Sequence, residues 1–140
     1  IKVMAPQSIE RRFKRWARAH NIELHLQESK SLSGRSGSSY ENLAEEWLLN
    51  APVKLLGRNV YFPFAEIDRV ILKDRQIHLI EVKSKGLDPH FHSRVSEVQK
   101  QRIHRCLVFL QEEIKCVVRA HLVTFDKNHR IICYPDFLRD

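Results

Sequence analysis

Two short segments of the sequence contain carboxylates and a lysine that a β-sheet could bring together. Residues 65–68 read Ala-Glu-Ile-Asp, and residues 80–83, after a short turn, read Ile-Glu-Val-Lys. If both segments are strands, the two-residue period of a strand places Glu81 and Lys83 on one face and Val82 on the other. Two convergent carboxylates and substrate phosphate oxygens can hold Mg²⁺, which activates water. These residue types therefore predict metal-dependent phosphodiester hydrolysis.

Asp68, Glu81 and Lys83 are the central candidates for this chemistry. Strands disfavour aspartate, so Asp68 is interpreted as a metal ligand, with a solvent-facing hairpin position as the alternative. Glu81 and Lys83 could form an ordinary surface ion pair. They lie, however, in the most apolar strand of the chain, where lone charges are costly, and this favours a functional interpretation.

Two further residues are weaker candidates for the same site. Glu41 lies in the first turn of an expected helix, where it could reach the site or simply interact with the helix dipole. Gln99 is the polar member of an otherwise apolar helical stripe. It could reach the site, or it could simply be a polar residue at the edge of that stripe. We expect Mg²⁺ or Mn²⁺ bound by Asp68, Glu81, Glu41 and the carbonyl of Val82, with Lys83 positioning the attacking water and Gln99 assisting.

The elements that must position these residues follow from hydrophobic periodicity and turn residues. Helices are expected over residues 7–20, from Ser38 or Ser39 to about Asn50, and from His92 or Ser93 to about Glu112. Strands are expected over residues 53–61, 65–72, 77–83, 115–125 and 130–134. The order predicts an α/β domain over residues 37–140, preceded over residues 1–36 by a basic helix and a Ser/Gly-rich linker.

Composition and charge restrict the classes of function. The 140 residues are 43% hydrophobic and carry a net charge of +7, of which +5 falls on residues 1–39. A basic excess at one end favours a polyanionic partner, although a solvated basic helix is the alternative. No apolar run is long enough to span a membrane, and three cysteines without metal-ligand spacing indicate reduced thiols. We therefore expect a cytoplasmic protein without a membrane partner.

The expected first helix could dock on the body of the protein or lie along DNA, because it has a narrow apolar stripe between basic residues. Further cations occur after the Glu-Val-Lys strand and on the expected long helix. The candidate phosphate contacts are Arg11, Arg12, Lys14, Arg15, Arg18, Lys85, Arg94, Lys100 and Arg102.

These residues, taken in order, resemble the PD-(D/E)XK nuclease superfamily. Its acids and lysine match Asp68 and residues 81–83, with twelve residues between Asp68 and Glu81. Within the superfamily the chain is similar to the bacterial YraN-like family and, more distantly, to archaeal Holliday-junction resolvases. Further positions of the YraN-like pattern match Glu41, Ala44, Trp47, Leu48, Arg58 and Asn59. The departures are Tyr40 and Ala65, where the family has glycine. The family also has a lysine one turn into the second helix, and the matching position here is Gln99 or Lys100, depending on the register.

The resemblance covers about residues 37–125 and implies a restriction-endonuclease-like core, a mixed sheet flanked by helices in the order α-β-β-β-α-β-β. It also implies metal-dependent DNA cleavage, and it leaves a homodimer open. No element looks like a helix that reads DNA sequence, so branched, flapped or single-stranded DNA is the expected substrate. The alternatives are a DNA-binding module of the same fold with a weakened site, and a basic protein-interaction domain.

Overall fold

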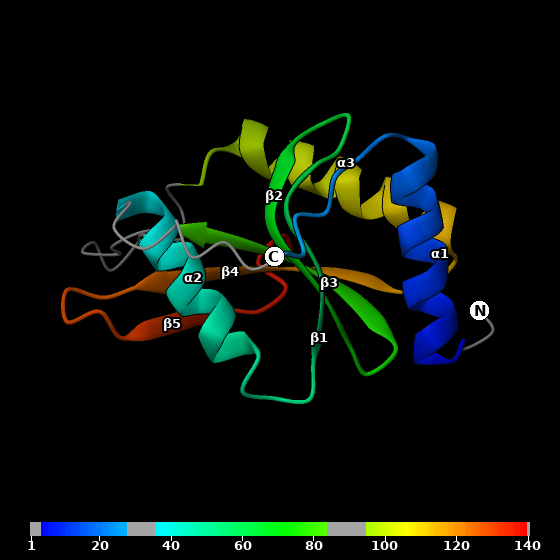
Figure 1. The fold of residues 1–140 in the computed structure, drawn as a ribbon. Helices are drawn as coiled ribbons and strands as arrows, with labels where there is room; N and C mark the ends of the chain where they lie inside the picture. The colour runs from blue at the N-terminus through cyan, green and yellow to red at the C-terminus, as the bar shows by residue number, and fades with distance from the viewer. Residues whose placement is uncertain (1–3, 28–35, 84–94, 140) are drawn as a thin grey trace.

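The computed structural model describes residues 4–27, 36–83 and 95–139. In this described part, three helices and five strands follow the order α1, α2, β1, β2, β3, α3, β4, β5 (Figure 1). The helices are Pro6–Ala19 (α1), Ser36–Leu48 (α2) and Glu97–Ile114 (α3). The strands are Lys54–Tyr61 (β1), Glu66–Lys73 (β2), Gln76–Lys83 (β3), Val118–Phe125 (β4) and Ile131–Tyr134 (β5). This succession of elements and the α/β class confirm the expectation from the sequence.

The five strands form one mixed sheet in the order β1-β2-β3-β4-β5. Strand β3 pairs in parallel with β4, and the other three pairings are antiparallel. The parallel pair requires a crossover, and α3 is the helix that lies between these two strands in the chain. The tight β2–β3 connection uses Asp74 and Arg75 at φ angles of 52° and 61°, the backbone that primed hairpin turns require. This mixed five-stranded sheet with three helices is consistent with the restriction-endonuclease-like core that the sequence resemblance implies.

Helices cover both faces of the sheet and form two hydrophobic clusters with it. The larger cluster joins α1 and α3 to one face, and the smaller cluster joins α2 to the other. Along β3, Ile77 and Leu79 belong to the larger cluster, whereas Ile80 and Val82 contact the smaller one. This alternation is the one that the sequence predicts, and it places Glu81 on the side of α3.

Helix α1 docks on the body of the protein, which answers the question that its amphipathic pattern leaves open. Ile9 and Phe13 are fully buried, and Trp16 is 5% exposed within the larger cluster. The division of the chain at residue 37 stays a prediction. No helix in the described part of the chain is long and apolar enough to cross a membrane.

The helix boundaries differ most from the expectation. Helix α2 begins at Ser36, before the expected cap at Ser38 or Ser39, because serine and glycine are tolerated in a helix that tertiary contacts hold. Helix α3 begins at Glu97 rather than near residue 92, because the side chain of Ser96 caps it by accepting a hydrogen bond from the backbone N–H of Gln99. This cap fixes the position of Gln99 in the first turn.

Candidate active site

Asp68 and Glu81 meet where strands β2 and β3 stop pairing. The last paired residues of the two strands are Arg69 and Ile80. Beyond them, the Oδ2 atom of Asp68 accepts a hydrogen bond from the backbone N–H of Val82 at 2.7 Å. The aspartate side chain thus replaces a ladder carbonyl, which holds its carboxylate beside the backbone of the Glu-Val-Lys segment.

Glu81 is buried, with 6% of its surface exposed, and two polar neighbours contact one of its carboxylate oxygens. Its Oε2 atom accepts a hydrogen bond from Gln99 Nε2 at 2.8 Å and lies 3.9 Å from Lys83 Nζ. Its Oε1 atom is buried without a hydrogen-bond partner in the described part of the chain. A buried carboxylate oxygen without a partner is costly, so this atom is suited to an incoming donor or cation.

The proximity of the two carboxyl groups changes their protonation. Burial and the neighbouring charge of Asp68 raise the pKa of Glu81 to about 8, and the ammonium of Lys83 opposes this shift. Burial and the charge of Glu41 together raise the pKa of Asp68 to about 6, although the hydrogen bond from the Val82 backbone opposes this shift. Two such groups share protons near neutral pH, and a cation between them would stabilise the fully ionised pair.

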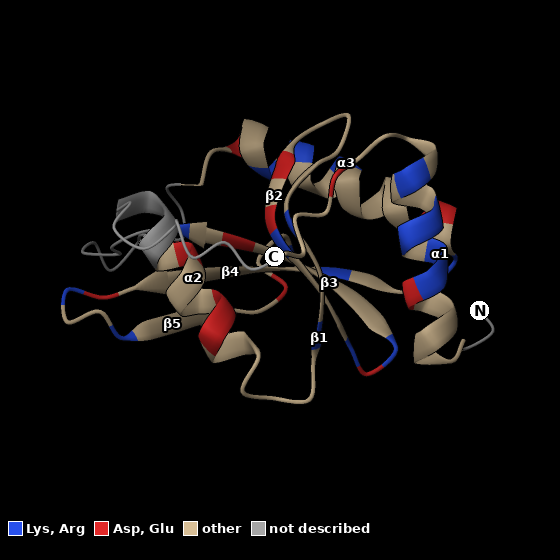
Figure 2. Cartoon of the chain, in the orientation of Figure 1, with Lys and Arg blue, Asp and Glu red and all other residues tan. Residues whose placement is uncertain are grey.

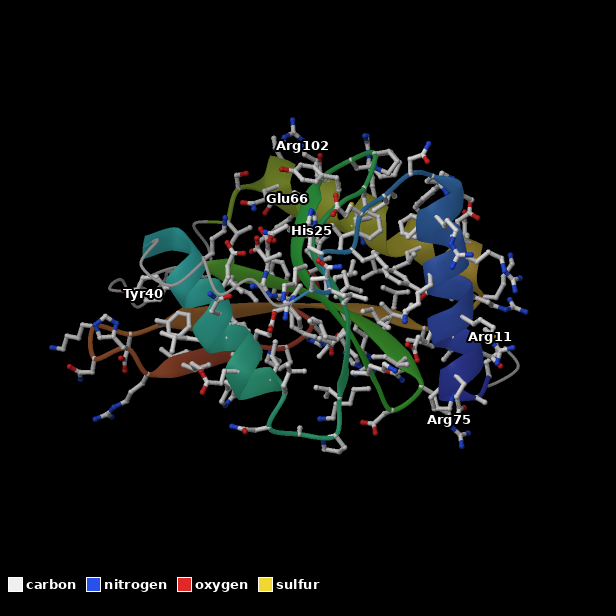
Figure 3. All side chains as sticks on the ribbon, in the orientation of Figure 1. Arg11, His25, Tyr40, Glu66, Arg75 and Arg102 are labelled. Atoms are coloured by element: carbon white, nitrogen blue, oxygen red, sulfur yellow. The ribbon has the colours of Figure 1, made fainter. Side chains whose placement is uncertain are left out.

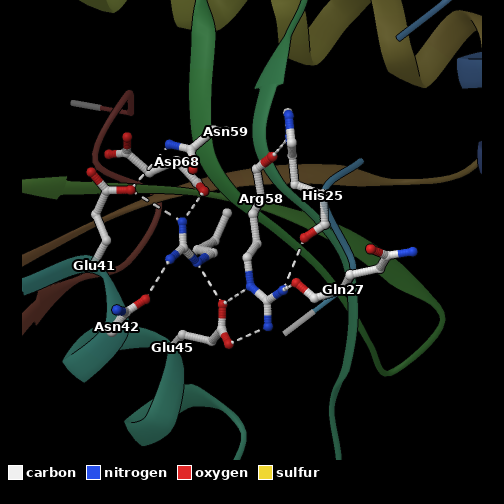
Figure 4. A network of polar contacts seen from close by, with 9 residues as sticks. His25, Gln27, Glu41, Asn42, Glu45, Arg58, Asn59 and Asp68 are labelled. Atoms are coloured by element: carbon white, nitrogen blue, oxygen red, sulfur yellow. Dashed lines mark hydrogen bonds and ion pairs between the residues drawn. The ribbon is translucent and has the colours of Figure 1, made fainter. Parts of the chain in front are cut away.

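Glu41 lies near this pair but has its own partners (Figure 4). Its Oε1 atom accepts hydrogen bonds from Asn59 Nδ2 and from Arg69 Nη1, both at 3.1 Å. Within residues 4–27, 36–83 and 95–139, no three His, Cys, Asp or Glu side chains are already gathered as a metal-binding group. The structure therefore brings Asp68, Glu81, Lys83 and Gln99 together, and the metal role of Glu41 stays a prediction.

The donor set nevertheless fits a hard divalent ion. Asp68 and Glu81 offer carboxylate oxygens, and Glu81 Oε1 has no hydrogen-bond partner among the described residues. Mg²⁺ is commonly held by one or two carboxylates, with water and substrate phosphate supplying the other ligands. The raised pKa values of Asp68 and Glu81 mean that nearby positive charges and hydrogen-bond donors do not fully stabilise the two ionised carboxylates, which a bound cation would do. Asp68, Glu81 and the Val82 carbonyl are the groups that would hold it, with Glu41 next to them.

Comparison with known proteins identifies the family. Residues 40–131 match the uncharacterised protein family UPF0102. The chain belongs to this family. UPF0102 belongs to the PD-(D/E)XK nuclease-like superfamily, which confirms the resemblance seen in the sequence.

Several UPF0102 proteins are similar to the chain. One from Vibrio parahaemolyticus is 31% identical over 104 residues, covering 74% of this chain and 84% of that protein. One from Campylobacter fetus is 32% identical over 73 residues, covering 52% and 65%. One from Helicobacter hepaticus is 33% identical over 69 residues, covering 49% and 63%, so the chain spans less than two thirds of the latter two relatives. The solved structure of Pyrococcus furiosus SfsA in complex with Ca²⁺ is 15% identical, covers 71% of this chain and 62% of that chain, and has a TM-score of 0.34.

A buried ion-pair network lies beside the site, within the part that matches UPF0102. Arg69 is 1% exposed, and its Nε atom donates to Glu45 Oε1 at 2.7 Å. Arg58 donates to both oxygens of Glu45, at 2.7 and 2.8 Å, in a bidentate pair. Burial alone would raise the pKa of Glu45, but the two guanidinium groups outweigh it and lower the pKa. The network attaches α2, which carries Glu41, to strands β1 and β2.

Sequence reasoning missed this network. Neither Arg69 nor Glu45 is among the candidate residues that the sequence indicates. The available signal was an arginine within the apolar run of residues 67–72, together with glutamates four residues apart on α2.

The candidate phosphate contacts occupy several parts of this UPF0102 chain. Helix α1 carries the densest group of cations (Figure 2), with Arg11, Arg12, Arg15 and Arg18 exposed. Lys14 is partly neutralised by Glu10 at 2.9 Å. On α3, Lys100 lies 3.7 Å from Glu97, and Arg102 is exposed (Figure 3). Lys85 and Arg94 lie outside the described residues.

Proposed function

We propose that this UPF0102 protein is a Mg²⁺- or Mn²⁺-dependent deoxyribonuclease, a structure-selective endonuclease of DNA repair, recombination or processing. The observation that carries the proposal is the pairing of half-buried Asp68 with buried Glu81, whose Oε1 atom has no hydrogen-bond partner among the described residues and whose Oε2 atom lies 3.9 Å from the Lys83 ammonium. Membership of a nuclease-like superfamily supports a hydrolase of this type. Free thiols in the described part of the chain agree with a cytoplasmic location.

The residues of the site divide the chemistry among them. Asp68, Glu81 and the carbonyl of Val82 would hold the ion, and Gln99 orients Glu81 through its hydrogen bond. When bound, the ion polarises the phosphoryl oxygen and lowers the pKa of water. Lys83, half-buried and close to Glu81, orients the attacking water or donates to the charge that develops on the phosphorane oxygens.

Branched, flapped or single-stranded DNA is the proposed substrate. Two helices carry exposed cations, and neither is placed like a helix that inserts into the major groove of DNA. Helix α1 buries its apolar stripe in the core, and α3 forms the crossover between the parallel strands β3 and β4. Contacts to phosphates fix position without reading bases, so selection by DNA shape agrees with this arrangement. A homodimer stays a prediction that a solution molecular-mass measurement tests.

A cleavage assay tests the proposal directly. Branched and single-stranded oligonucleotides and supercoiled plasmid are incubated with the protein in Mg²⁺, in Mn²⁺ and in EDTA. We expect metal-dependent cutting that Asp68→Asn abolishes and that Lys83→Met reduces by roughly 10² to 10³. Asp74→Asn in the β2–β3 turn and Lys127→Met in the β4–β5 turn are matched exposed controls, which should cut like the wild type.

Two outcomes would contradict the nuclease proposal. Cutting that persists in EDTA or in Asp68→Asn would not come from this site. Salt-sensitive DNA binding without any cutting would instead support a binding module of the same fold, a rival that the engagement of Glu41 by Arg69 favours. A salt-independent interaction, or no binding at all, would point to a protein-interaction domain.

A further inference from the structure

A basic groove lies between α1 and the C-terminal half of α3, outside the candidate active site. It has a volume of about 330 Å³, and its lining residues are Arg12, Arg15, Trp16, Ala19, His20 and Glu113. Helix α1 precedes the part of the chain that matches UPF0102, so the groove is made by joining an additional helix to the nuclease-like core. Figure 3 shows α1 packed beside the end of α3.

The groove is rich in hydrogen-bond donors. Arg15 is exposed, and Arg12 uses one guanidinium nitrogen on the carbonyl of Ile114 at 3.3 Å, which anchors that arginine at the groove. Trp16 is 5% exposed, and its indole N–H has no hydrogen-bond partner in the described part of the chain. Glu113 is the single acid among the lining residues. The guanidinium groups of Arg12 and Arg15 suit an anion with several oxygens, such as a phosphate.

Helix α3 connects this groove to the candidate active site. Gln99 in its first turn contacts Glu81, and Glu113 near its end lines the groove. Fourteen residues at about 1.5 Å per residue place the two contacts roughly 21 Å apart along the helix axis. Arg102, Phe109 and Glu113 are spaced by seven and four residues and lie on one side of α3. Phe109 contacts the rings of Trp16 and His20, so Arg102 lies on the side of α3 that faces the groove.

We propose that this groove binds a backbone phosphate of the DNA strand about six nucleotides from the bond to be cut. The figure of six follows from roughly 21 Å of helix and about 3.4 Å of axial length per nucleotide in one strand of a B-form duplex arm. The inference rests on the proposed nuclease function, because it assigns the groove to the same substrate. Its consequence is a minimum substrate length: DNA that reaches Arg12 and Arg15 binds more tightly than DNA that covers only the carboxylate pair.

Binding measurements without cleavage test the groove separately from catalysis. Fluorescence anisotropy in EDTA gives the dissociation constant for branched DNA whose duplex arm increases from three to twelve base pairs. For the wild type we expect affinity to rise by about tenfold once the arm exceeds about six base pairs. Arg15→Ala, alone and with Arg12→Ala, should remove this rise and leave binding of short arms unchanged. Each lost contact should lower the slope of log affinity against log salt by about 1.

Matched variants exclude a general effect of charge or of unfolding. Lys127→Ala removes the same charge from the turn between β4 and β5 and should keep the length dependence. Arg15→Lys retains the charge and should recover part of the gain, and thermal unfolding establishes that each variant is folded. Equal losses for short and long arms, or equal effects of Arg15→Ala and Lys127→Ala, would overturn the inference. If the length dependence is found but metal-dependent cutting is not, phosphate binding in the groove is supported and the proposed nuclease function fails. If cutting is found without length dependence, the nuclease function is supported and the groove inference fails.

Discussion

The side-chain amide of Gln99 donates a hydrogen bond to Glu81, with 2.8 Å between Nε2 and Oε2. Gln99 lies in the first turn of α3, and its backbone N–H donates to the side chain of Ser96, which caps the helix. The capped end of a helix thus orients a buried carboxylate on the neighbouring strand. This arrangement makes Gln99 a positioning residue for Glu81.

Removal of this hydrogen bond should weaken metal binding. In Gln99→Ala, Glu81 loses a donor that stabilises its charged form, so its pKa should rise above the present value of about 8 and protons should compete better with the ion. We expect Mn²⁺ affinity near pH 7.5, measured by isothermal titration calorimetry, to fall by roughly 10- to 100-fold. Part of the loss should be recovered at pH 9.

Gln101→Ala is the control for this prediction, because Gln101 is an exposed residue of the same helix. It should bind Mn²⁺ like the wild type. A Gln99→Ala protein with unchanged affinity at pH 7.5 would show that the amide does not position Glu81. An equal loss at every pH would show that the effect does not act through the protonation of Glu81.

The raised pKa values predict how stability depends on pH in EDTA. The folded pKa values of about 8 for Glu81 and about 6 for Asp68 exceed the ordinary values of 4.5 and 3.8, so the folded state retains protons that the unfolded state releases. The contribution of the pair to the free energy of unfolding is therefore greatest below the ordinary values. It decreases as pH rises through about 6 and about 8, by a few kcal/mol at most.

Urea unfolding from pH 5 to pH 9 measures this dependence. The difference in stability between Asp68→Asn/Glu81→Gln and the wild type isolates the pair, and it should grow in favour of the variant as pH rises. Mg²⁺ or Mn²⁺ should stabilise the wild type more at pH 8 than at pH 5 and should not stabilise the variant. A difference that is constant with pH would mean that folding raises the pKa of neither carboxyl group.

Arg69 should be among the most sensitive positions for stability. Arg69→Met removes a buried guanidinium and leaves Glu45 and Glu41 with fewer partners, which should lower the free energy of unfolding by about 3–5 kcal/mol. Adding Glu45→Gln to this variant should restore part of the loss, because it removes the uncompensated charge. Urea unfolding measures both, with exposed Arg130→Met as the control expected within about 0.5 kcal/mol of the wild type.

Local patterns in the sequence were sufficient to predict the strands and the proximity of Asp68 to Glu81. The alternation of β3 predicts the faces of Ile77, Ile80 and Glu81, because one residue of register would move every apolar side chain of the strand to the wrong face. Asp68 stood out because aspartate is rare in strands. Its hydrogen bond to the backbone of Val82 was not predictable, since it depends on where β2 and β3 stop pairing.

Long-range contacts account for what the sequence left undecided. Arg69 is 24 and 28 positions from its partners Glu45 and Glu41, and such pairings have no local signature. The sequence left open whether α1 docks on the body of the protein or lies along DNA. Docking depends on a complementary apolar surface on α3 and the sheet, which is formed only in the folded chain. The start of α3 was misplaced because several serines and histidines precede it in the sequence. The cap is defined by the extended backbone of Ser96 and its hydrogen bond from Gln99, which no local pattern distinguishes.

The most direct test of the account is the position of a divalent ion in crystals of this protein soaked with Mn²⁺ at pH 8. Anomalous scattering should show an ion between the carboxylates of Asp68 and Glu81, and the peak should vanish in Asp68→Asn/Glu81→Gln crystals. A Mn²⁺ peak elsewhere, or no peak between the two carboxylates at saturating Mn²⁺, would contradict the claim that these two side chains form a metal site.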